Sequence, residues 1–267
     1  MSFITDSAEC EGFETEYVKF GSGDKALVIL PGLSVQSLIP LAPAIEKQYG
    51  LFKNEFTVYL FERRKDLPGS YSVYDMGNET AGAMKTLGIK DACIFGVSQG
   101  GMIAMCLALD YPELVSRLAL GSTAARVSES RSGVIKEWIS LAEKADCEGL
   151  YLSFGKRVYP ENVFESFKDT FKEMAKTVSD EDLKRFIILA RGTLGFDVTD
   201  KLENINCPLL LTGDDSDGVL GEEAFKELEA LLSDKEDFEA YLYSSFGHAV
   251  YDTAPDYTER LYNFFTK

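Results

Sequence analysis

Histidine is almost absent from this chain of 267 residues, which contains only one, His248. Metal sites built from several histidines are therefore excluded, and no H-x-x-x-H or Cys/His cluster indicates a metal. The five cysteines are widely spaced and include no C-x-x-C pair, which argues against both a zinc site and a disulfide framework. Because the sequence also lacks a P-loop and a G-x-G-x-x-G string, we expect neither a metal nor a cofactor.

Basic residues are also scarce. The chain has 27 Lys and Arg against 44 Asp and Glu, a formal net charge of −17. Such a surface repels phosphates, so nucleic acid and anionic membranes are not expected as partners. No apolar run approaches the roughly 20 residues of a membrane span, and the first residues lack a signal-peptide pattern. We expect a cytoplasmic protein that acts on a small molecule; its oligomeric state is left open.

Short apolar runs alternate with helical patterns along much of the chain. An apolar run without polar alternation is typical of a strand in a parallel sheet that helices cover on both faces. Residues 124–200 contain helical patterns but no convincing strand, and the alternation then resumes with "CPLLLTGDD". We therefore predict one α/β domain, residues 1–123 and 201–267, interrupted by a helical insertion at 124–200. The apolar runs before the insertion are "KALVILPG", "FTVYLFERR" (56–64), "DACIFGVS" and "SRLALGST" (116–123).

The string G-V-S-Q-G, residues 96–100, lies between one of these apolar runs and an apolar helix. A G-x-S-x-G string at a strand–turn–helix junction can hold its serine in a strained conformation, with the hydroxyl at a helix N-terminus. Glycines and serine also form ordinary tight turns, so the context decides the interpretation. It makes Ser98 the candidate nucleophile.

With this motif in this context, the chain resembles a single-domain α/β-hydrolase that carries a cap. The resemblance covers nearly the whole length. It implies a mostly parallel central sheet with helices on both faces, and a helical cap formed by residues 124–200. It also implies a catalytic triad in the chain order Ser, Asp or Glu, His.

The resemblance places the base on the loop after the last strand, where His248 follows a glycine. It places the acid on the loop after "CPLLLTG", which contains Asp214, Asp215 and Asp217. The family's usual position, three residues past the glycine, is Ser216 here. If the loop is one residue longer, "DSDGVL" resembles the common D-G-x-x-P continuation, which favours Asp217 over Asp215, with Asp214 third.

An oxyanion hole completes the implied site. One donor is the backbone N–H of Gln99, the residue after the nucleophile, and the other comes from the turn "PGLSVQS". The family turn usually begins His-Gly, whereas this one begins with Pro31 and Gly32. We expect Leu33 to supply the second N–H, with Ser34 as the alternative.

These residues indicate acyl transfer through an acyl-enzyme, most simply hydrolysis of a carboxylic ester. Two alternatives stay open: a non-catalytic ligand-binding relative, and a carbon–carbon bond hydrolase or enol-lactonase that uses the same triad. Aromatic residues in 124–200 are expected mainly to pack the cap, with some lining an apolar pocket. Arg126, Arg157 and Arg191 are candidates either for binding a substrate carboxylate or for ordinary ion pairs.

Overall fold

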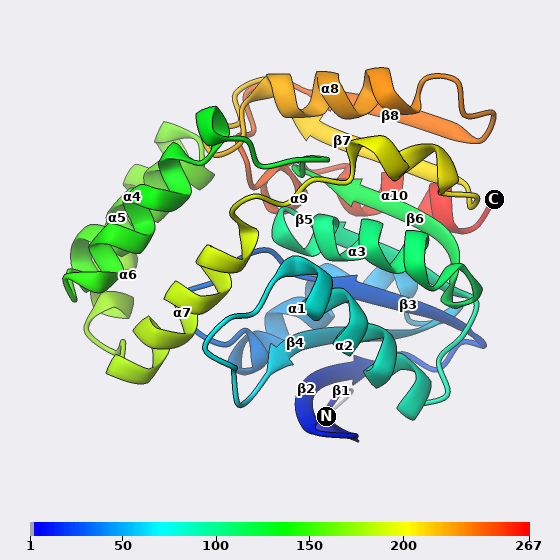
Figure 1. Ribbon diagram of the computed structural model, residues 1–267, viewed down its shortest axis with the longest axis horizontal. Helices are drawn as coiled ribbons and strands as arrows, with labels where there is room; N and C mark the ends of the chain where they lie inside the picture. The colour runs from blue at the N-terminus through cyan, green and yellow to red at the C-terminus, as the bar shows by residue number, and fades with distance from the viewer. Residues whose placement is uncertain (1–2) are drawn as a thin grey trace.

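The computed structural model describes residues 3–267. Within this range eight strands form one sheet in the order β1-β2-β4-β3-β5-β6-β7-β8 (Figure 1). Antiparallel pairing joins β1 to β2 and β2 to β4, and all other neighbours are parallel. The predicted α/β class with a mostly parallel sheet is confirmed. The strands are β1 (Phe3–Cys10), β2 (Phe13–Phe20), β3 (Lys25–Leu30), β4 (Phe56–Arg64), β5 (Ala92–Val97), β6 (Val115–Gly121), β7 (Leu209–Asp214) and β8 (Phe238–Tyr243).

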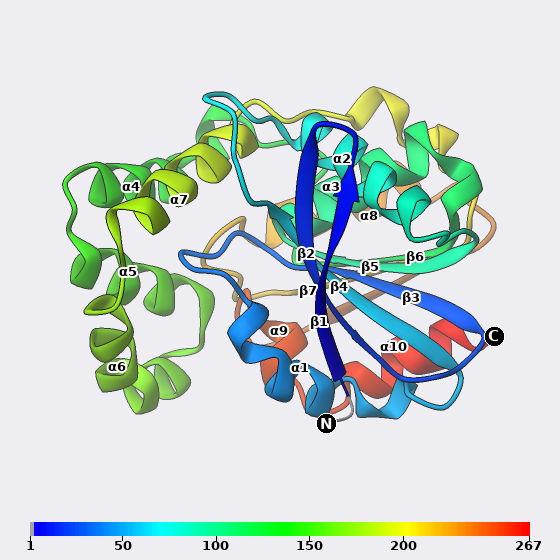
Figure 2. The same ribbon diagram turned by 90° about the horizontal axis from the view of Figure 1, so that it is seen from below.

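Helices cover both faces of the sheet (Figure 2). One face carries α2 (Val73–Thr86), α3 (Gln99–Asp110) and α8 (Glu222–Leu232), and the other carries α1 (Ala42–Gln48), α9 (Val250–Thr253) and α10 (Tyr257–Phe265). The buried side chains form two clusters that follow these faces. The first contains Met84 and Ile103, and the second contains Ile45, Leu261 and Phe264. Short 3-10 helices span Ile39–Leu41, Gly50–Phe52, Pro112–Leu114, Glu129–Arg131 and Thr199–Asn204.

The central strands are apolar because both of their faces are covered. Every residue of β5 and of β7 is buried. Burial on both faces removes the polar alternation of a half-exposed strand and favours a continuous apolar run. No helix within residues 3–267 has the length and apolar character needed to cross a bilayer.

Residues between β6 and β7 form a separate group of helices, which we call the cap segment (residues 124–200). Its helices are α4 (Gly133–Glu143), α5 (Cys147–Val158), α6 (Glu161–Ala175) and α7 (Asp180–Thr193). In both views α4–α6 stand to one side of the sheet, and α7 lies between them and the core (Figures 1 and 2). A β-bridge between Arg126 and Asp197 joins the two ends of the segment.

Candidate active site

Ser98 occupies the turn between β5 and α3 in a strained conformation. Its φ is 52° and its ψ is −120°, a region that L-residues other than glycine rarely adopt. The turn is so tight that a Cβ at Gly96 would lie 2.4 Å from the Gly100 carbonyl oxygen. A Cβ at Gly100 would lie 1.9 Å from the Leu30 carbonyl oxygen. The two glycines of G-x-S-x-G are therefore required by the close approach of β5, α3 and the end of β3.

This close approach gives a stability prediction. Gly100→Ala is expected to lower the free energy of unfolding by about 3 kcal/mol or more, because a backbone atom cannot move aside as a side chain can. Gly133→Ala is the matched control, since nothing lies within 4 Å of a Cβ at that position. Urea unfolding of both variants measures the difference. Equal stability of the Gly100→Ala variant and wild type would contradict the turn geometry.

Hydrogen bonds fix the backbone of Ser98 on both sides. Its N–H donates to the Gly121 carbonyl oxygen at 2.9 Å, and the Thr123 hydroxyl donates to the Ser98 carbonyl oxygen at 2.7 Å. The side chain is half-buried and stands at the N-terminus of α3. Free N–H groups and the helix dipole at this end favour negative charge. The environment therefore suits an oxygen that gains negative charge.

The sole histidine pairs with one of the three candidate carboxylates. Nδ1 of His248 lies 2.8 Å from Oδ2 of Asp217, and the two side chains are only 5% and 6% exposed. The other oxygen of Asp217 accepts hydrogen bonds from the N–H groups of Val219 (2.8 Å) and Leu220 (3.0 Å). Burial acts to raise the pKa of the Asp217 carboxyl, but His248 and these two N–H groups outweigh it and hold the pKa below its ordinary value.

The lowered pKa of Asp217 predicts how its contribution to stability depends on pH. A carboxyl whose pKa is lower in the folded chain stabilises it fully above the unfolded-chain pKa of about 4, and this contribution is lost as the pH falls through the folded-chain pKa. The difference in free energy of unfolding between wild type and Asp217→Asn should therefore narrow between pH 5 and pH 3. Chemical unfolding at both pH values measures it. A difference that widened on acidification would contradict this sign.

The other two aspartates bind elsewhere. Asp214 accepts from the N–H groups of Phe246 (2.9 Å) and Gly247 (3.0 Å), and so ties the end of β7 to the loop that carries the histidine. Asp215 accepts from the Ser244 hydroxyl at 2.7 Å and lies at the surface. The structure thus brings Asp217 to His248 and gives Asp214 and Asp215 other partners.

The loop that carries His248 is also held by the cap segment. The N–H of Ala249 donates to the carbonyl oxygen of Val158, at the end of α5. Gly247, the residue before the histidine, has a φ of 74°. Among residues 3–267 no hydrogen bond joins the Ser98 hydroxyl to the His248 ring. Catalytic hydrogen bonds often tighten only when a substrate is bound.

The turn after β3 lies directly against Ser98. A Cβ at Gly32 would be 3.2 Å from the Ser98 Cβ. Within the described chain, the backbone N–H groups of Leu33, Ser34 and Gln99 have no acceptor. These are the N–H groups that the sequence singled out as oxyanion donors.

Sequence reasoning did not single out Arg63, a buried cation at the end of β4. Its side chain donates to the Pro31 carbonyl oxygen at 2.7 Å and to the Gln99 side-chain oxygen at 3.3 Å. The residue is 7% exposed. A signal was present in the sequence, because "FERR" puts charged residues at the carboxyl end of an apolar strand, the edge where ligands bind in α/β sheets.

The three arginines that were candidates either for binding a substrate carboxylate or for ordinary ion pairs are each paired with a glutamate. Arg126 pairs with Glu227, Arg157 with Glu137 and Arg191 with Glu143. Several aromatic side chains of the cap segment are buried. These are Trp138, Tyr151, Phe164, Phe186 and Phe196, whereas Phe167 is 53% exposed.

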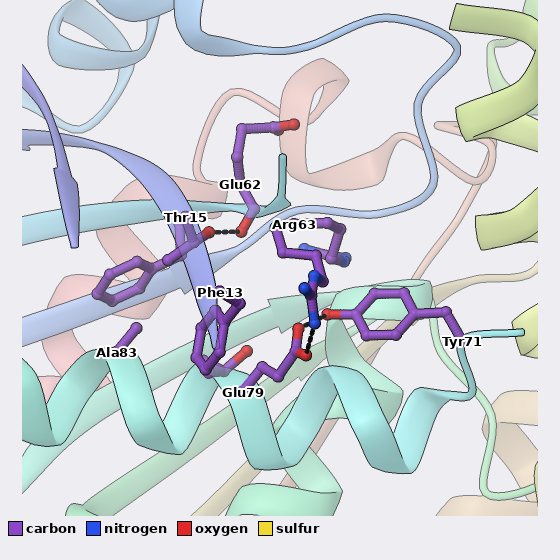
Figure 3. A pocket seen from close by; sticks show the side chains of 10 residues that line it. Phe13, Thr15, Glu62, Arg63, Tyr71, Glu79 and Ala83 are labelled. Carbon is purple, nitrogen blue, oxygen red and sulfur yellow. Dashed lines mark hydrogen bonds and ion pairs between the residues drawn. The ribbon is translucent and has the colours of Figure 1, made fainter. Parts of the chain in front are cut away.

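Two hollows in the structure lie away from Ser98. A cavity of about 10 Å³ lies beside Arg63 and Arg64, and Figure 3 shows the hydroxyl of Tyr71 pointing at the carboxylate of Glu79 there. A shallower hollow of about 430 Å³ lies between β8 and α10. Neither is lined by Ser98 or His248. The first is part of the packing between β4 and α2.

Comparisons with known proteins identify the family. The family model described as alpha/beta hydrolase fold matches residues 25–255. The chain belongs to the α/β-hydrolase family. It is an enzyme of that family, and the predicted resemblance is confirmed.

Individual relatives are distant. The mouse protein named "Serine hydrolase BPHL" is 26% identical over 155 residues, 52% of this chain and 52% of the relative, so the match spans about half of that protein. "3-oxoadipate enol-lactonase 2" of Acinetobacter baylyi is 20% identical over 222 residues, 80% of each chain. Among solved structures, the α/β-hydrolase MGS-M2, from a deep-sea metagenome library of the Medee basin, superposes with a TM-score of 0.84 at 20% identity. That superposition covers 96% of this chain and 95% of the other.

Proposed function

We propose that this α/β-hydrolase hydrolyses a small carboxylic ester through a Ser98–His248–Asp217 triad and an acyl-enzyme intermediate. The observation that carries the proposal is the buried 2.8 Å contact between His248 and Asp217, on a chain whose other triad element, Ser98, stands at a strained turn. A single histidine paired with a buried carboxylate at the carboxyl edge of the sheet suits a general base.

The reaction runs in two halves. The Ser98 oxygen attacks the ester carbonyl carbon while His248 Nε2 takes the hydroxyl proton, and the carbonyl oxygen becomes an anion. The intermediate then collapses, the C–O bond to the alcohol breaks, and His248 returns the proton to the leaving alcohol. Water attacks the acyl-enzyme in the second half, again losing a proton to His248, and the carboxylic acid leaves as Ser98 recovers its proton.

Asp217 serves as the orienting acid. It accepts the Nδ1 proton of His248, which leaves Nε2 free to act as the base and stabilises the imidazolium when it forms. Its second oxygen is occupied by the N–H groups of Val219 and Leu220, so the carboxylate cannot turn away from the ring. The oxyanion is received by the free N–H groups of Gln99 and Leu33.

We infer that the acyl group is neutral and that the cap segment covers it. The three arginines that could receive a substrate carboxylate already pair with glutamates. The net charge of −17 also repels anionic substrates. An enol-lactonase is the second candidate, because a relative bears that name and a lactone ring opens by the same attack.

We also infer a reducing compartment, the cytoplasm, because all five cysteines are free thiols. Burial raises the pKa of the Cys106 thiol to about 12 and that of Cys207 to about 11. Both thiols therefore stay protonated and unreactive, as free structural cysteines do.

A substrate panel tests the ester proposal. p-Nitrophenyl esters of graded acyl length, an enol-lactone and a 1,5-diketone are compared with the wild-type enzyme. We expect the butanoate ester to be hydrolysed at least about tenfold faster than the similar but charged hemisuccinate ester. Turnover of the lactone or the diketone alone would favour the alternative reactions, and equal rates for the two esters would contradict a neutral acyl group.

A further inference from the structure

A buried arginine connects the two backbone segments that carry the proposed oxyanion donors. The guanidinium of Arg63 contacts both segments. Its Nη2 donates to the Pro31 carbonyl oxygen at 2.7 Å and to the Gln99 side-chain oxygen at 3.3 Å. Pro31 begins the turn that carries Leu33, and Gln99 is the other donor residue itself. One guanidinium therefore bridges the two halves of the oxyanion hole.

The amide of Gln99 has only one orientation that satisfies its contacts. Its Nε2 donates to the Leu189 carbonyl oxygen at 2.8 Å and to the Thr193 hydroxyl at 2.7 Å, which uses both of its hydrogens. Its oxygen must then face Arg63. The side chain is 1% exposed, so no solvent competes for these bonds. Because Leu189 and Thr193 belong to α7, this network continues into the cap segment.

The turn at Pro31 needs support from its carbonyl side. Pro31 has no N–H to donate, and Gly32 has no side chain that could anchor the turn. A Cβ at Gly32 would lie only 3.2 Å from the Ser98 Cβ. A Cβ at Gly100 would also be only 2.5 Å from the Pro31 carbonyl oxygen, so α3 and the turn are already in contact. The hydrogen bond from Arg63 is the contact that fixes the direction of this peptide.

The positive charge of Arg63 has an effect beyond its hydrogen bonds. Burial lowers the pKa of its guanidinium to about 10, partly opposed by Glu62, so the side chain is still a cation at neutral pH. Glu62 itself is bound by Arg185 of α7 at 2.6 Å. A neutral side chain could donate the same two hydrogen bonds without the cost of burying a charge. A cation here also attracts the negative charge that develops on the substrate oxygen.

We propose that Arg63 is a positioning residue, which holds the N–H groups of Leu33 and Gln99 in register for the oxyanion and links them through Gln99 to α7. The inference rests on the proposed ester hydrolysis. The inference adds to the proposed reaction a residue outside the triad. Loss of this residue weakens binding of the tetrahedral intermediate but leaves binding of the substrate unchanged.

The experiment compares Arg63→Met and Arg63→Lys with Arg64→Met. Arg64 is the matched control because it follows in the same strand but donates to Glu79 and to the Gly12 carbonyl oxygen. For Arg63→Met we expect kcat to fall about 10- to 100-fold, with KM changed by less than about twofold. Binding of a trifluoromethyl ketone, which forms a tetrahedral adduct with the serine, should weaken by the same factor as kcat. Arg63→Lys should fall between wild type and Arg63→Met, and Arg64→Met should keep the wild-type kcat.

Thr193→Val serves as the variant that leaves the buried arginine in place. It removes one acceptor of the Gln99 amide, and we expect a loss of kcat of about threefold to tenfold. If Arg63→Met does not fold, Arg63→Lys and Thr193→Val carry the test.

Several outcomes would overturn the inference. Unchanged kcat and ketone affinity in folded Arg63 variants would do so and would leave the triad proposal standing. The same loss in Arg64→Met, or a change confined to KM, would assign the effect to general packing. A wild-type enzyme without Ser98-dependent turnover would overturn the proposed function, and this inference with it.

Discussion

Replacing Ser98 with alanine is expected to lower kcat for ester hydrolysis by about 10⁵- to 10⁶-fold. The substitution removes the only atom that forms the acyl-enzyme, and what remains is the small effect of the oxyanion donors on direct attack by water. The fold should be retained, because the backbone of residue 98 is held by Gly121 and Thr123 and not by its own side chain. Steady-state kinetics and thermal unfolding measure the two quantities.

Ser122→Ala is the matched control for this substitution. Ser122 also follows a parallel strand, also has a positive φ (44°), and its buried hydroxyl has no partner within the described chain. Its removal should change kcat by less than about threefold. Similar losses in the two variants would mean that the loss comes from local packing, and the assignment of Ser98 as nucleophile would then be wrong.

Replacing Asp217 with asparagine is expected to lower kcat by about 10⁴-fold. The amide can donate to Nδ1 of His248, which would put the ring proton on Nε2, the atom that must act as base. The imidazolium would also lose its negative partner. KM should change little, because the carboxylate touches the histidine and not the substrate. Steady-state kinetics at several pH values should show this loss wherever the wild-type enzyme is active.

Asp215→Asn separates this effect from a general change of charge on the loop. Asp215 lies two residues away and is bound to Ser244 and Ser245, so its neutralisation should alter kcat by less than about threefold. A larger loss in Asp215→Asn than in Asp217→Asn would contradict the pairing seen in the structure.

The strands that are buried on both faces could be predicted from the sequence, because burial requires a continuous run of apolar residues. The run "FTVYLFERR" coincides with β4, and the run "SRLALGST" (116–123) contains all of β6 except its first residue. Strand β1 was harder to predict. It lies at the edge of the sheet and only one of its residues is buried, so its sequence "FITDSAEC" follows no clear alternation. Its pairing with β2 comes from backbone hydrogen bonds that leave no apolar pattern.

The turn after β8, the strand at the other edge of the sheet, also depends on contacts that no local pattern predicts. The resemblance places His248 on the loop after the last strand, and β8 does end at Tyr243, five residues before His248. Gly247, with its positive φ, and the bonds of Phe246 and Gly247 to Asp214 set this turn. These contacts join segments about 30 residues apart, so no local pattern encodes them.

Two features of the candidate site could not be predicted from the spacing of residues in the sequence. Which aspartate approaches His248 depended on the length of one loop, and only coordinates could separate positions 214, 215 and 217. Arg63 was missed because a charged residue at a strand end is usually solvated. Its hydrogen-bond partners, Pro31 and Gln99, lie more than 30 residues away in the sequence, so no local pattern shows that it is buried.

Intact-mass analysis after treatment with a fluorophosphonate probe tests the central claim most directly. Such a probe phosphonylates only a serine that an adjacent base activates. The account predicts a single adduct on wild type and none on Ser98→Ala, with strongly slowed labelling of His248→Ala. An unlabelled but folded wild-type protein, or an adduct that persists in Ser98→Ala, would contradict Ser98 as the nucleophile.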